Sequence, residues 1–297
     1  MIQTIRELLK GSIDMHAHAG PDVYPRWGDM LDVALEAKEA GMKAIVFKDH
    51  HTITADRAYL VNKMVPEFTC VGGIALSHSV GGLNPRAVKI AIELGGKIVW
   101  MASPVDVAWM VKQVYERGEA QWAKGLMRTQ DPKKGISVLK GGLEGSEILP
   151  EVEEILNLIA EANIILDICH LSTREHEIIV DEAKRGGVEK IILTHPNCSA
   201  GYTAIEEQKQ LVKKGVYMDY AYLPVTPLFD RQDPNEIVNM IKEIGAEHSL
   251  LCTDFGQPAN PSAVEGMRIF ISTLLMKGVS KEEVKKMVQE NPAKLLF

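Results

Sequence analysis

Short apolar runs alternate with amphipathic helical segments along almost the whole of this sequence. Glycines and prolines separate most of the runs from segments with apolar residues at helical spacing, as in residues 150–162. Near-continuous apolar strands with a helix between each pair are typical of a buried parallel sheet. The pattern predicts an α/β fold, a (β/α)8 TIM barrel. The eight predicted strands cover residues 13–18, 43–47, 69–77, 97–102, 164–169, 190–194, 216–220 and 249–253.

The alternation pauses once, between the fourth and fifth predicted strands. Residues 105–130 have a polar and irregular helical pattern, and residues 135–149 predict a small hairpin that turns near Gly141 or Gly145. We expect this helix-plus-hairpin insertion, at about residues 104–149, to form a lid or a flap. No internal repeat, charge block or linker indicates a second domain, so we expect one barrel over residues 1–297.

The composition excludes several classes of protein. Hydrophobic residues make up 46% of the chain and charged residues 25%, which allows a sizeable core. A net charge of -7 gives no support for nucleic-acid binding. There is no charged-then-apolar leader and no apolar run of membrane-spanning length, and the four cysteines lack CxxC spacing. We expect a cytoplasmic protein with reduced thiols, a homo-oligomer with no membrane or nucleic-acid partner.

Two histidines lie two positions apart at the end of the first predicted strand. Strand side chains alternate between faces, which predicts Asp14, His16 and His18 on one face and Ile13, Met15 and Ala17 on the other. Gly20-Pro21 then ends the strand. Two imidazoles on one face of a stiff strand suit a metal cation, although such a pair can also be two ordinary polar residues.

Further polar residues directly follow other predicted strands. His170 follows the fifth strand, His195 the sixth and Asp254 the eighth. The carboxyl ends of parallel barrel strands share one rim, so these side chains should converge there and hold a divalent cation. Asp14 and Asp167 should face the barrel interior and orient their neighbours. Seven of the nine histidines lie at predicted strand ends: His16, His18, His50, His51, His78, His170 and His195.

This arrangement resembles that of the amidohydrolase superfamily of metal-dependent hydrolases. The C-terminal residues 291–296, Asn-Pro-Ala-Lys-Leu-Leu, are similar to the Asn-Pro-Ala-x-x-Leu segment on the helix that closes many such barrels. The resemblance spans nearly the whole chain. It implies that His16, His18, His170 and Asp254 bind the metal. His195 would bind a second metal, or contact the substrate or the attacking water.

The resemblance leaves open whether the site holds one metal ion or two. Two-metal members usually have a carboxylated lysine or a glutamate after strand four, whereas residues 100–104 here are Trp-Met-Ala-Ser-Pro. We therefore favour one divalent ion, with two as the alternative. Zinc is our first choice, although imidazole also suits iron, nickel and cobalt. In a two-metal form Lys48, after the second strand, would carry the carbamate, and Lys140 is a weaker candidate.

Together these features predict a metal-dependent hydrolase. A metal-activated water would attack an amide, lactone or ester-like carbon centre of a small molecule. Asp254 would serve as general base, and His195 would polarise the carbonyl or hold the water. The alternatives are a metal-dependent decarboxylase on the same site and a non-catalytic, metal-containing binding barrel. A phosphoesterase with a trinuclear cluster would need more carboxylates at the strand ends.

The expected substrate contacts follow the second and third predicted strands. Lys48, His50 and His51 would bind an anionic group of the substrate, and a solvated loop is the alternative for them. His78 would also touch the substrate, or else serve only the structure of its loop. For Arg26, after the first strand, surface packing is our preferred interpretation over an anion clamp. The substrate itself does not follow from the sequence, because a barrel hosts many chemistries.

Overall fold

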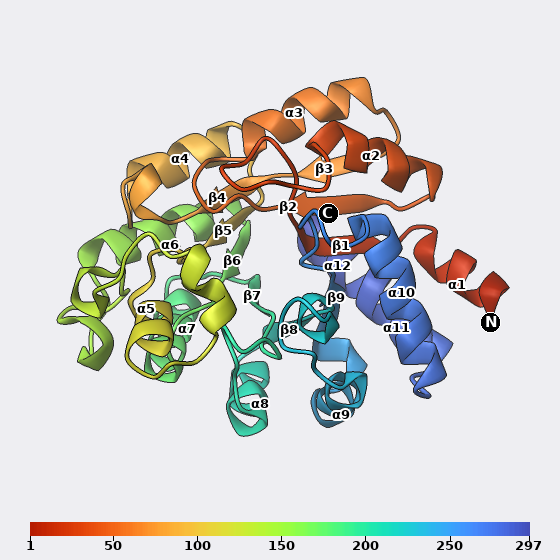
Figure 1. The fold of residues 1–297 in the computed structure, drawn as a ribbon. Coiled ribbons are helices and arrows are strands. Elements are labelled where there is room, and N and C mark those ends of the chain that lie inside the picture. Colours follow the sequence, from red (N-terminus) through yellow and green to blue (C-terminus); the bar gives the residue numbers. More distant parts are fainter.

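The computed structural model describes residues 1–297 and places parallel strands in the middle of the molecule, with helices outside them (Figure 1). One sheet has the order β1 (Ile13–Ala17), β2 (Ala44–Phe47), β3 (Thr69–Val71). The other has the order β4 (Gly73–Ala75), β5 (Ile98–Trp100), β6 (Ile165–Asp167), β7 (Ile191–Thr194), β8 (Val216–Ala221), β9 (Ser249–Cys252). Each of the eight predicted runs contains a strand, and the run at 69–77 contains two.

The two sheets adjoin each other on both sides. Only Gly72 separates β3 from β4. On the other side, the N–H of Asp254 donates to the His16 carbonyl oxygen at 2.8 Å, and the N–H of His18 donates to the Phe255 carbonyl oxygen at 2.7 Å. The carboxyl ends of β1 and β9 are therefore neighbours, although they stand at opposite ends of the sequence.

Helices cover the outside of the strands, and side chains at their first turns fix where several of them begin. Asp29 and Ser172 form capping boxes, in which each side chain accepts a hydrogen bond from a backbone N–H of the first turn. A π-helical turn over Lys286–Glu290 lies between the last two helices of the chain. The helices are α1 (Ile2–Leu9), α2 (Met30–Glu39), α3 (Ala55–Met64), α4 (Pro85–Glu93), α5 (Ala108–Tyr115), α6 (Pro150–Ala162), α7 (Thr173–Arg185), α8 (Ile205–Lys213), α9 (Pro234–Ile244), α10 (Ala263–Met276), α11 (Lys281–Lys285) and α12 (Asn291–Leu296).

The core has a layer between strands and helices and a smaller cluster formed by the opposite faces of the strands. Ile13 and Met15 belong to the smaller cluster, but Ala17 belongs to the larger one. The predicted sharing of one face by these three residues is therefore wrong. The cause is a shift in the β1–β2 register between Asp14 and Ala17, because a bulge interrupts the alternation of side chains.

The insertion between β5 and α6 differs from the predicted helix and hairpin. Helix α5 ends at Tyr115, and three short 3₁₀ turns follow it, at Gln121–Gly125, Pro132–Lys134 and Gly142–Glu144. The predicted hairpin is reduced to a single antiparallel bridge between Leu139 and Ile148. Residues 105–130 lack one continuous apolar stripe, so no long helix can bury a face there.

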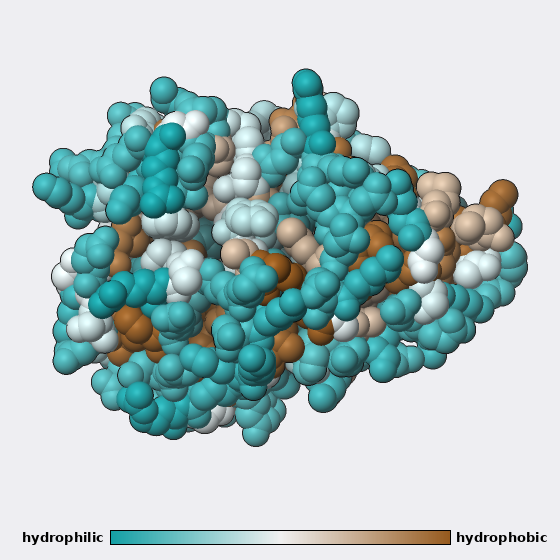
Figure 2. All heavy atoms as spheres, turned by 90° about the horizontal axis from the view of Figure 1, so that it is seen from below, coloured by the Kyte–Doolittle hydropathy of each residue, from teal (hydrophilic) through white to brown (hydrophobic).

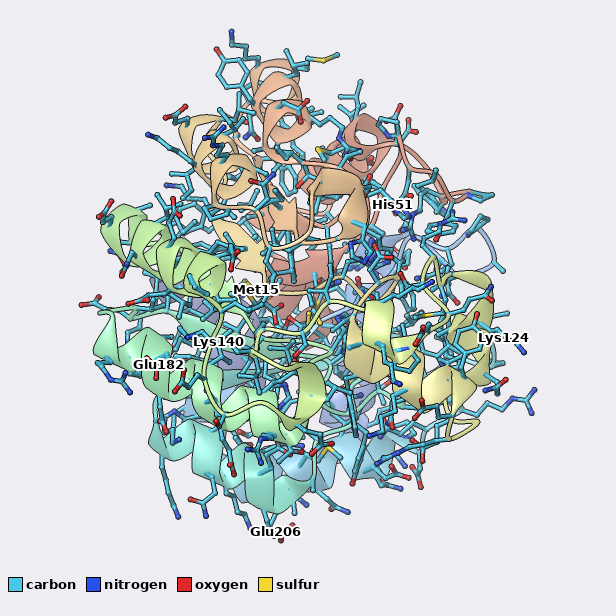
Figure 3. The ribbon with its side chains drawn as sticks, turned by 90° about the vertical axis from the view of Figure 1, so that its left-hand side faces the viewer. Met15, His51, Lys124, Lys140, Glu182 and Glu206 are labelled. Carbon is cyan, nitrogen blue, oxygen red and sulfur yellow. The ribbon has the colours of Figure 1, made fainter.

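The surface is mainly polar. Figure 2 shows a largely hydrophilic face with apolar side chains gathered in a few patches. In Figure 3, Glu206 lies at the periphery, whereas Met15 lies among the strands. No helix combines the length and the apolar character needed to cross a lipid bilayer.

The close approach of β4 to β5 gives a test of the fold. A Cβ added at Gly73 would clash with the carbonyl oxygen and side chain of Ile98. We expect Gly73→Ala to lower the free energy of unfolding by about 1–3 kcal/mol, as overpacking does. Gly125→Ala is the control, because its Cβ would meet no atom within 4 Å. Urea unfolding followed by circular dichroism measures both, and equal stabilities would contradict this packing.

Candidate metal centre

Three predicted metal ligands meet where β1 and β9 end. His18 Nε2 lies 3.1 Å from Asp254 Oδ1, and His16 Nε2 lies 3.6 Å from the same oxygen. All three residues are buried, and one ligand atom from each lies within 4.8 Å of the others. Zinc ligands stand about 2 Å from their ion, so atoms this close can bind one cation.

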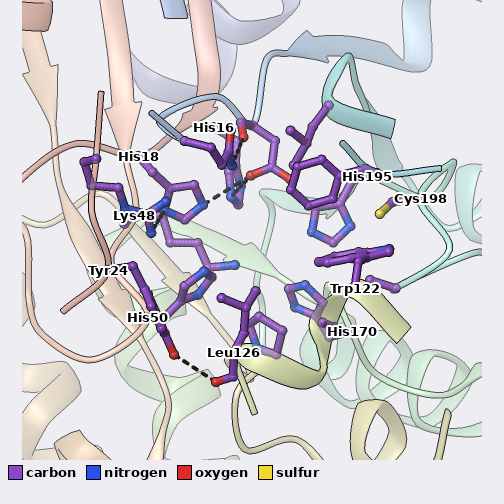
Figure 4. Close-up of a pocket in the computed structure, with 18 of the residues that line it drawn as sticks. His16, His18, Tyr24, Lys48, His50, Trp122, Leu126, His170, His195 and Cys198 are labelled. Atoms are coloured by element: carbon purple, nitrogen blue, oxygen red, sulfur yellow. Dashed lines mark hydrogen bonds and ion pairs between the residues drawn. The ribbon is translucent and has the colours of Figure 1, made fainter. Parts of the chain in front are cut away.

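A second group of potential ligands lies beside the first. Cys169, His170 and His195 also offer ligand atoms within 4.8 Å of one another, and all three are buried. The ring centroids of His170 and His195 are 4.6 Å apart, and those of His16 and His195 are 5.8 Å apart. The two groups therefore share one site (Figure 4). The structure brings all five predicted metal residues together, and their binding of a metal stays a prediction.

The protonation state of His18 favours a cation bound between His18 and Asp254. The Nδ1 atom lies 2.9 Å from the carbonyl oxygen of Lys48, which can only accept a hydrogen bond, and 3.3 Å from Arg26 Nη2, which can only donate one. The shorter contact favours the tautomer with the proton on Nδ1. In the neutral ring, Nε2 then directs a lone pair at the Asp254 carboxylate. Burial lowers the pKa of His18, and the nearby Arg26 adds to this effect, which favours the neutral ring. Two facing acceptors at 3.1 Å repel unless a cation lies between them.

The other histidines share this preference for the neutral state. Burial lowers the pKa of His16, His170 and His195, and the positive charge of Lys48 contributes in each case. Nδ1 of His16 and Nδ1 of His195 are buried without a hydrogen-bond partner. Neutral imidazoles with free ring nitrogens are the form in which histidine binds metals. The residues present therefore fit a divalent cation.

The backbone at three of these residues is unusual. His170, His195 and Asp254 have φ values of 67°, 46° and 56°, in the left-handed region that non-glycine residues seldom adopt. Such conformations cost roughly 1–3 kcal/mol each and persist where surrounding structure enforces them, commonly at functional sites. No pattern in the sequence signals them.

Buried carboxylates hold the strands that carry the site. Asp14 accepts hydrogen bonds from Thr253 Oγ1 at 2.5 Å and from the His16 N–H at 3.1 Å. In the same way, Asp167 accepts from Thr194 Oγ1 at 2.5 Å. The first bond links β1 to the end of β9, and the second links β6 to β7. These bonds confirm that Asp14 and Asp167 hydrogen-bond to their neighbours, whereas their facing the interior of a barrel stays a prediction.

An inner cavity of about 140 Å³ opens over the candidate ligands. Its polar lining includes the four histidines and Asp254 together with Lys48 and His50, whose contact with a substrate stays a prediction. Its remaining lining is largely apolar. Most of these apolar side chains come from the insertion and from the loop after β8: Trp122, Ala123, Leu126, Met127, Leu223 and Phe229.

The other two predicted substrate contacts lie elsewhere. His51 and His78 line an outer cavity of about 1130 Å³ that neither His16 nor Asp254 reaches. Tyr24 stands between the two cavities: it lines the inner one, and its ring centroid lies 5.6 Å from that of His51. Its hydroxyl donates to the Leu126 carbonyl oxygen at 2.8 Å (Figure 4).

Lys48 occupies an unusual place for a lysine. It is 1% exposed, and its Nζ lies 3.7 Å from Cys169 Sγ and 5.5 Å from the centre of the Trp100 ring. It takes part in none of the ion pairs of the chain. Lys140, the weaker carbamate candidate, is half exposed and pairs with Glu147 at 3.1 Å, outside either cavity.

Sequence reasoning missed several residues of the inner cavity. Arg26 is not surface packing: its side chain is 7% exposed, pairs with Asp22 at 2.7 Å and lies 3.3 Å from His18 Nδ1. Trp122 and Leu126 follow from no motif in the sequence. The one available signal for them is a pair of large apolar residues in an otherwise polar, irregular segment.

The Asp14–Thr253 hydrogen bond provides a test of the site's support. Thr253→Val would leave a buried carboxylate oxygen of Asp14 without its partner. We expect a loss of about 1–3 kcal/mol in the free energy of unfolding and a roughly 10- to 100-fold weaker affinity for Zn²⁺. Chelator competition measures the affinity. Thr129→Val is the control, because it removes a similar 2.9 Å bond to Asp106 away from the candidate ligands. Unchanged Zn²⁺ affinity in Thr253→Val would contradict this role.

A family model matches most of the chain. The model of a family of unknown function, DUF6282, matches residues 11–219. No curated protein matches the sequence.

Solved structures share the fold at low sequence identity. An amidohydrolase from Pseudomonas aeruginosa is 13% identical, covers 99% of this chain and 97% of its own, and has a TM-score of 0.65. A probable 2-pyrone-4,6-dicarboxylic acid hydrolase from Acinetobacter baumannii is 13% identical, with coverages of 96% and 99% and a TM-score of 0.59. A 2,6-dihydroxybenzoate decarboxylase from Rhizobium is 11% identical, with coverages of 97% and 98% and a TM-score of 0.56. These proteins belong to the amidohydrolase superfamily, so the predicted resemblance is confirmed for the fold.

Proposed function

The chain belongs to the family of unknown function DUF6282, and we propose that it is a metal-dependent hydrolase with the amidohydrolase fold. Its substrate is a small molecule with an amide, lactone or ester-like carbon centre. The observation that carries this proposal is the approach of His18 Nε2 to Asp254 Oδ1 at 3.1 Å, in a buried site whose histidines favour the neutral state.

A divalent cation, when bound, supplies Lewis-acid chemistry that lowers the pKa of water from about 15.7 to about 7. His16, His18, His170 and Asp254 would hold it. Burial raises the pKa of Asp254, but its neighbours His18, His195 and Lys48 together lower it by more, so Asp254 is ionised at neutral pH. Its carboxylate can accept a proton from the attacking water and return it to the leaving group. His195, whose Nδ1 has no partner, can donate to or accept from the reacting groups.

One cation is favoured over two. The second group would need Cys169 as a thiolate or a bridging anion, and burial raises the pKa of that thiol well above its usual value. A carbamate on Lys48 is the alternative that would support a second ion, since its Nζ lies beside this group. Zinc suits the nitrogen and oxygen ligands best.

The substrate contacts divide between the two cavities. Lys48 and His50 line the inner cavity and would face the reacting molecule, whereas His51 and His78 would contact it in the outer cavity before it passes Tyr24. For the fold, we infer that β3 and β4 are one strand interrupted at Gly72. Eight strands would then form the barrel that presents these residues on one rim.

Decarboxylation is the second candidate. A buried lysine without a carboxylate partner, next to the candidate ligands, is suited to a substrate carboxylate. A decarboxylase is also among the proteins that share the fold. Release of CO₂ with no hydrolysis product would assign the chain to this reaction.

The test uses purified protein loaded with Zn²⁺ and a panel of small amides, lactones and esters. We expect turnover that a chelator abolishes and that Asp254→Asn lowers by about 10²- to 10⁴-fold, because the general base is lost. Asp181→Asn is the control, since Asp181 is exposed and pairs only with Lys214 at 2.6 Å. Circular dichroism checks that each variant is folded. Activity near the wild-type level in folded Asp254→Asn would refute the assigned base.

A further inference from the structure

We propose that the inner cavity binds a small monocarboxylate whose apolar body is about the size of one six-membered ring. Lys48 would hold its carboxylate, and Trp122 would limit the size of its ring. This inference rests on the proposed function, because it names the substrate class of the same site. Three features of the cavity carry it: its volume, its one unpaired cation and its fixed aromatic wall.

The volume sets the upper limit. At about 140 Å³ the cavity is similar to an apolar cavity of about 150 Å³ that binds benzene in another protein. One ring therefore fits, whereas two fused rings do not. Large apolar side chains line it, among them Trp122, Leu126 and Phe229, so the transfer of a hydrocarbon body from water into the cavity is favourable.

The charge on Lys48 calls for an anion. Burying an ammonium group without a counter-charge is costly. Arg26, the other cation that lines the cavity, already pairs with Asp22 at 2.7 Å, whereas Lys48 has only the Cys169 thiol within hydrogen-bonding distance, at 3.7 Å. A carboxylate on the ligand would supply the missing partner. A neutral ligand of the same shape would leave the ammonium unpaired.

The aromatic wall is held in place from both ends. Trp122 Nε1 donates to Asp230 Oδ1 at 3.2 Å and to Ser199 Oγ at 3.1 Å, and the indole packs edge-on against Phe229 with centroids 4.7 Å apart. At the other end of the segment, Tyr24 holds the Leu126 carbonyl oxygen. In Figure 4 the Trp122 ring lies beside His170 and His195. An anchored ring sets a fixed size limit, since moving it would break these bonds.

Isothermal titration with four carboxylates tests the size limit in both the metal-free and the Zn²⁺-loaded protein. We expect benzoate and cyclohexanecarboxylate to bind at least about 10-fold more tightly than acetate, which buries less apolar area. We expect 2-naphthoate not to bind. Trp122→Ala should reverse this order by admitting 2-naphthoate and weakening benzoate. Trp109→Ala is the control, because Trp109 stacks on Arg117 and does not line the cavity. Trp122→Phe, which keeps a ring, serves if Trp122→Ala does not fold.

Ligand binding to a Lys48 variant tests the role of the lysine charge. Lys48→Met should weaken benzoate by about 10-fold or more while leaving neutral benzamide unchanged, because only the charged partner is lost. Equal binding of acetate and benzoate, equal binding of benzoate and 2-naphthoate, or an unchanged benzoate affinity in Lys48→Met would each overturn the inference. So would a ¹³C carbamate signal on Lys48, since that group is anionic. Size selectivity in protein that hydrolyses nothing would refute the proposed function alone, and hydrolysis without size selectivity would refute this inference alone.

Discussion

The contact between β1 and the end of β9 is the constraint on which the site depends. Asp14 and Thr253 are 239 residues apart in the chain, yet they share a buried 2.5 Å hydrogen bond. The backbone bond between Asp254 and His16 lies one step further along the same strands. Without this contact, the His-x-His pair and the single strand-end carboxylate would have no reason to meet, and no cation could be held between them.

The site combines several features that are unfavourable for stability taken singly. It buries neutral histidines with unpaired ring nitrogens, an unpaired lysine and three non-glycine residues with left-handed backbone. The packed strands around the site enforce these features, because hydrogen bonds of their aspartates and threonines fix the backbone in place. Features that lower the stability of the fold gather in this way where a protein binds a ligand or performs chemistry. A cation between His18 and Asp254 would remove the repulsion between their facing acceptor atoms.

The insertion completes the site by closing it. The strands supply the polar ligands, and residues 121–127 supply much of the apolar wall that faces them. The Tyr24 hydroxyl donates a hydrogen bond to this segment, and Trp122 donates to Ser199 and Asp230, which ties the segment to loops after β1, β7 and β8. Different parts of the chain therefore provide the polar ligands and the shape of the cavity. Substitutions in the insertion can change the shape of the cavity without changing the ligands.

The sequence by itself determined the strand and helix rhythm and the polar residues at the strand ends. Both depend on local periods of about 2 and 3.6 residues, which a single sequence displays directly. It also located His16, His18, His170, His195 and Asp254, because parallel strands must place their carboxyl ends together. Only the tertiary structure decided which neighbours share the inner cavity: Lys48 and His50 do, but His51, one residue further on, lies beyond Tyr24. The bulge in β1, the buried Arg26 and the wall formed by Trp122 were likewise decided by packing between distant segments, for which no local period exists.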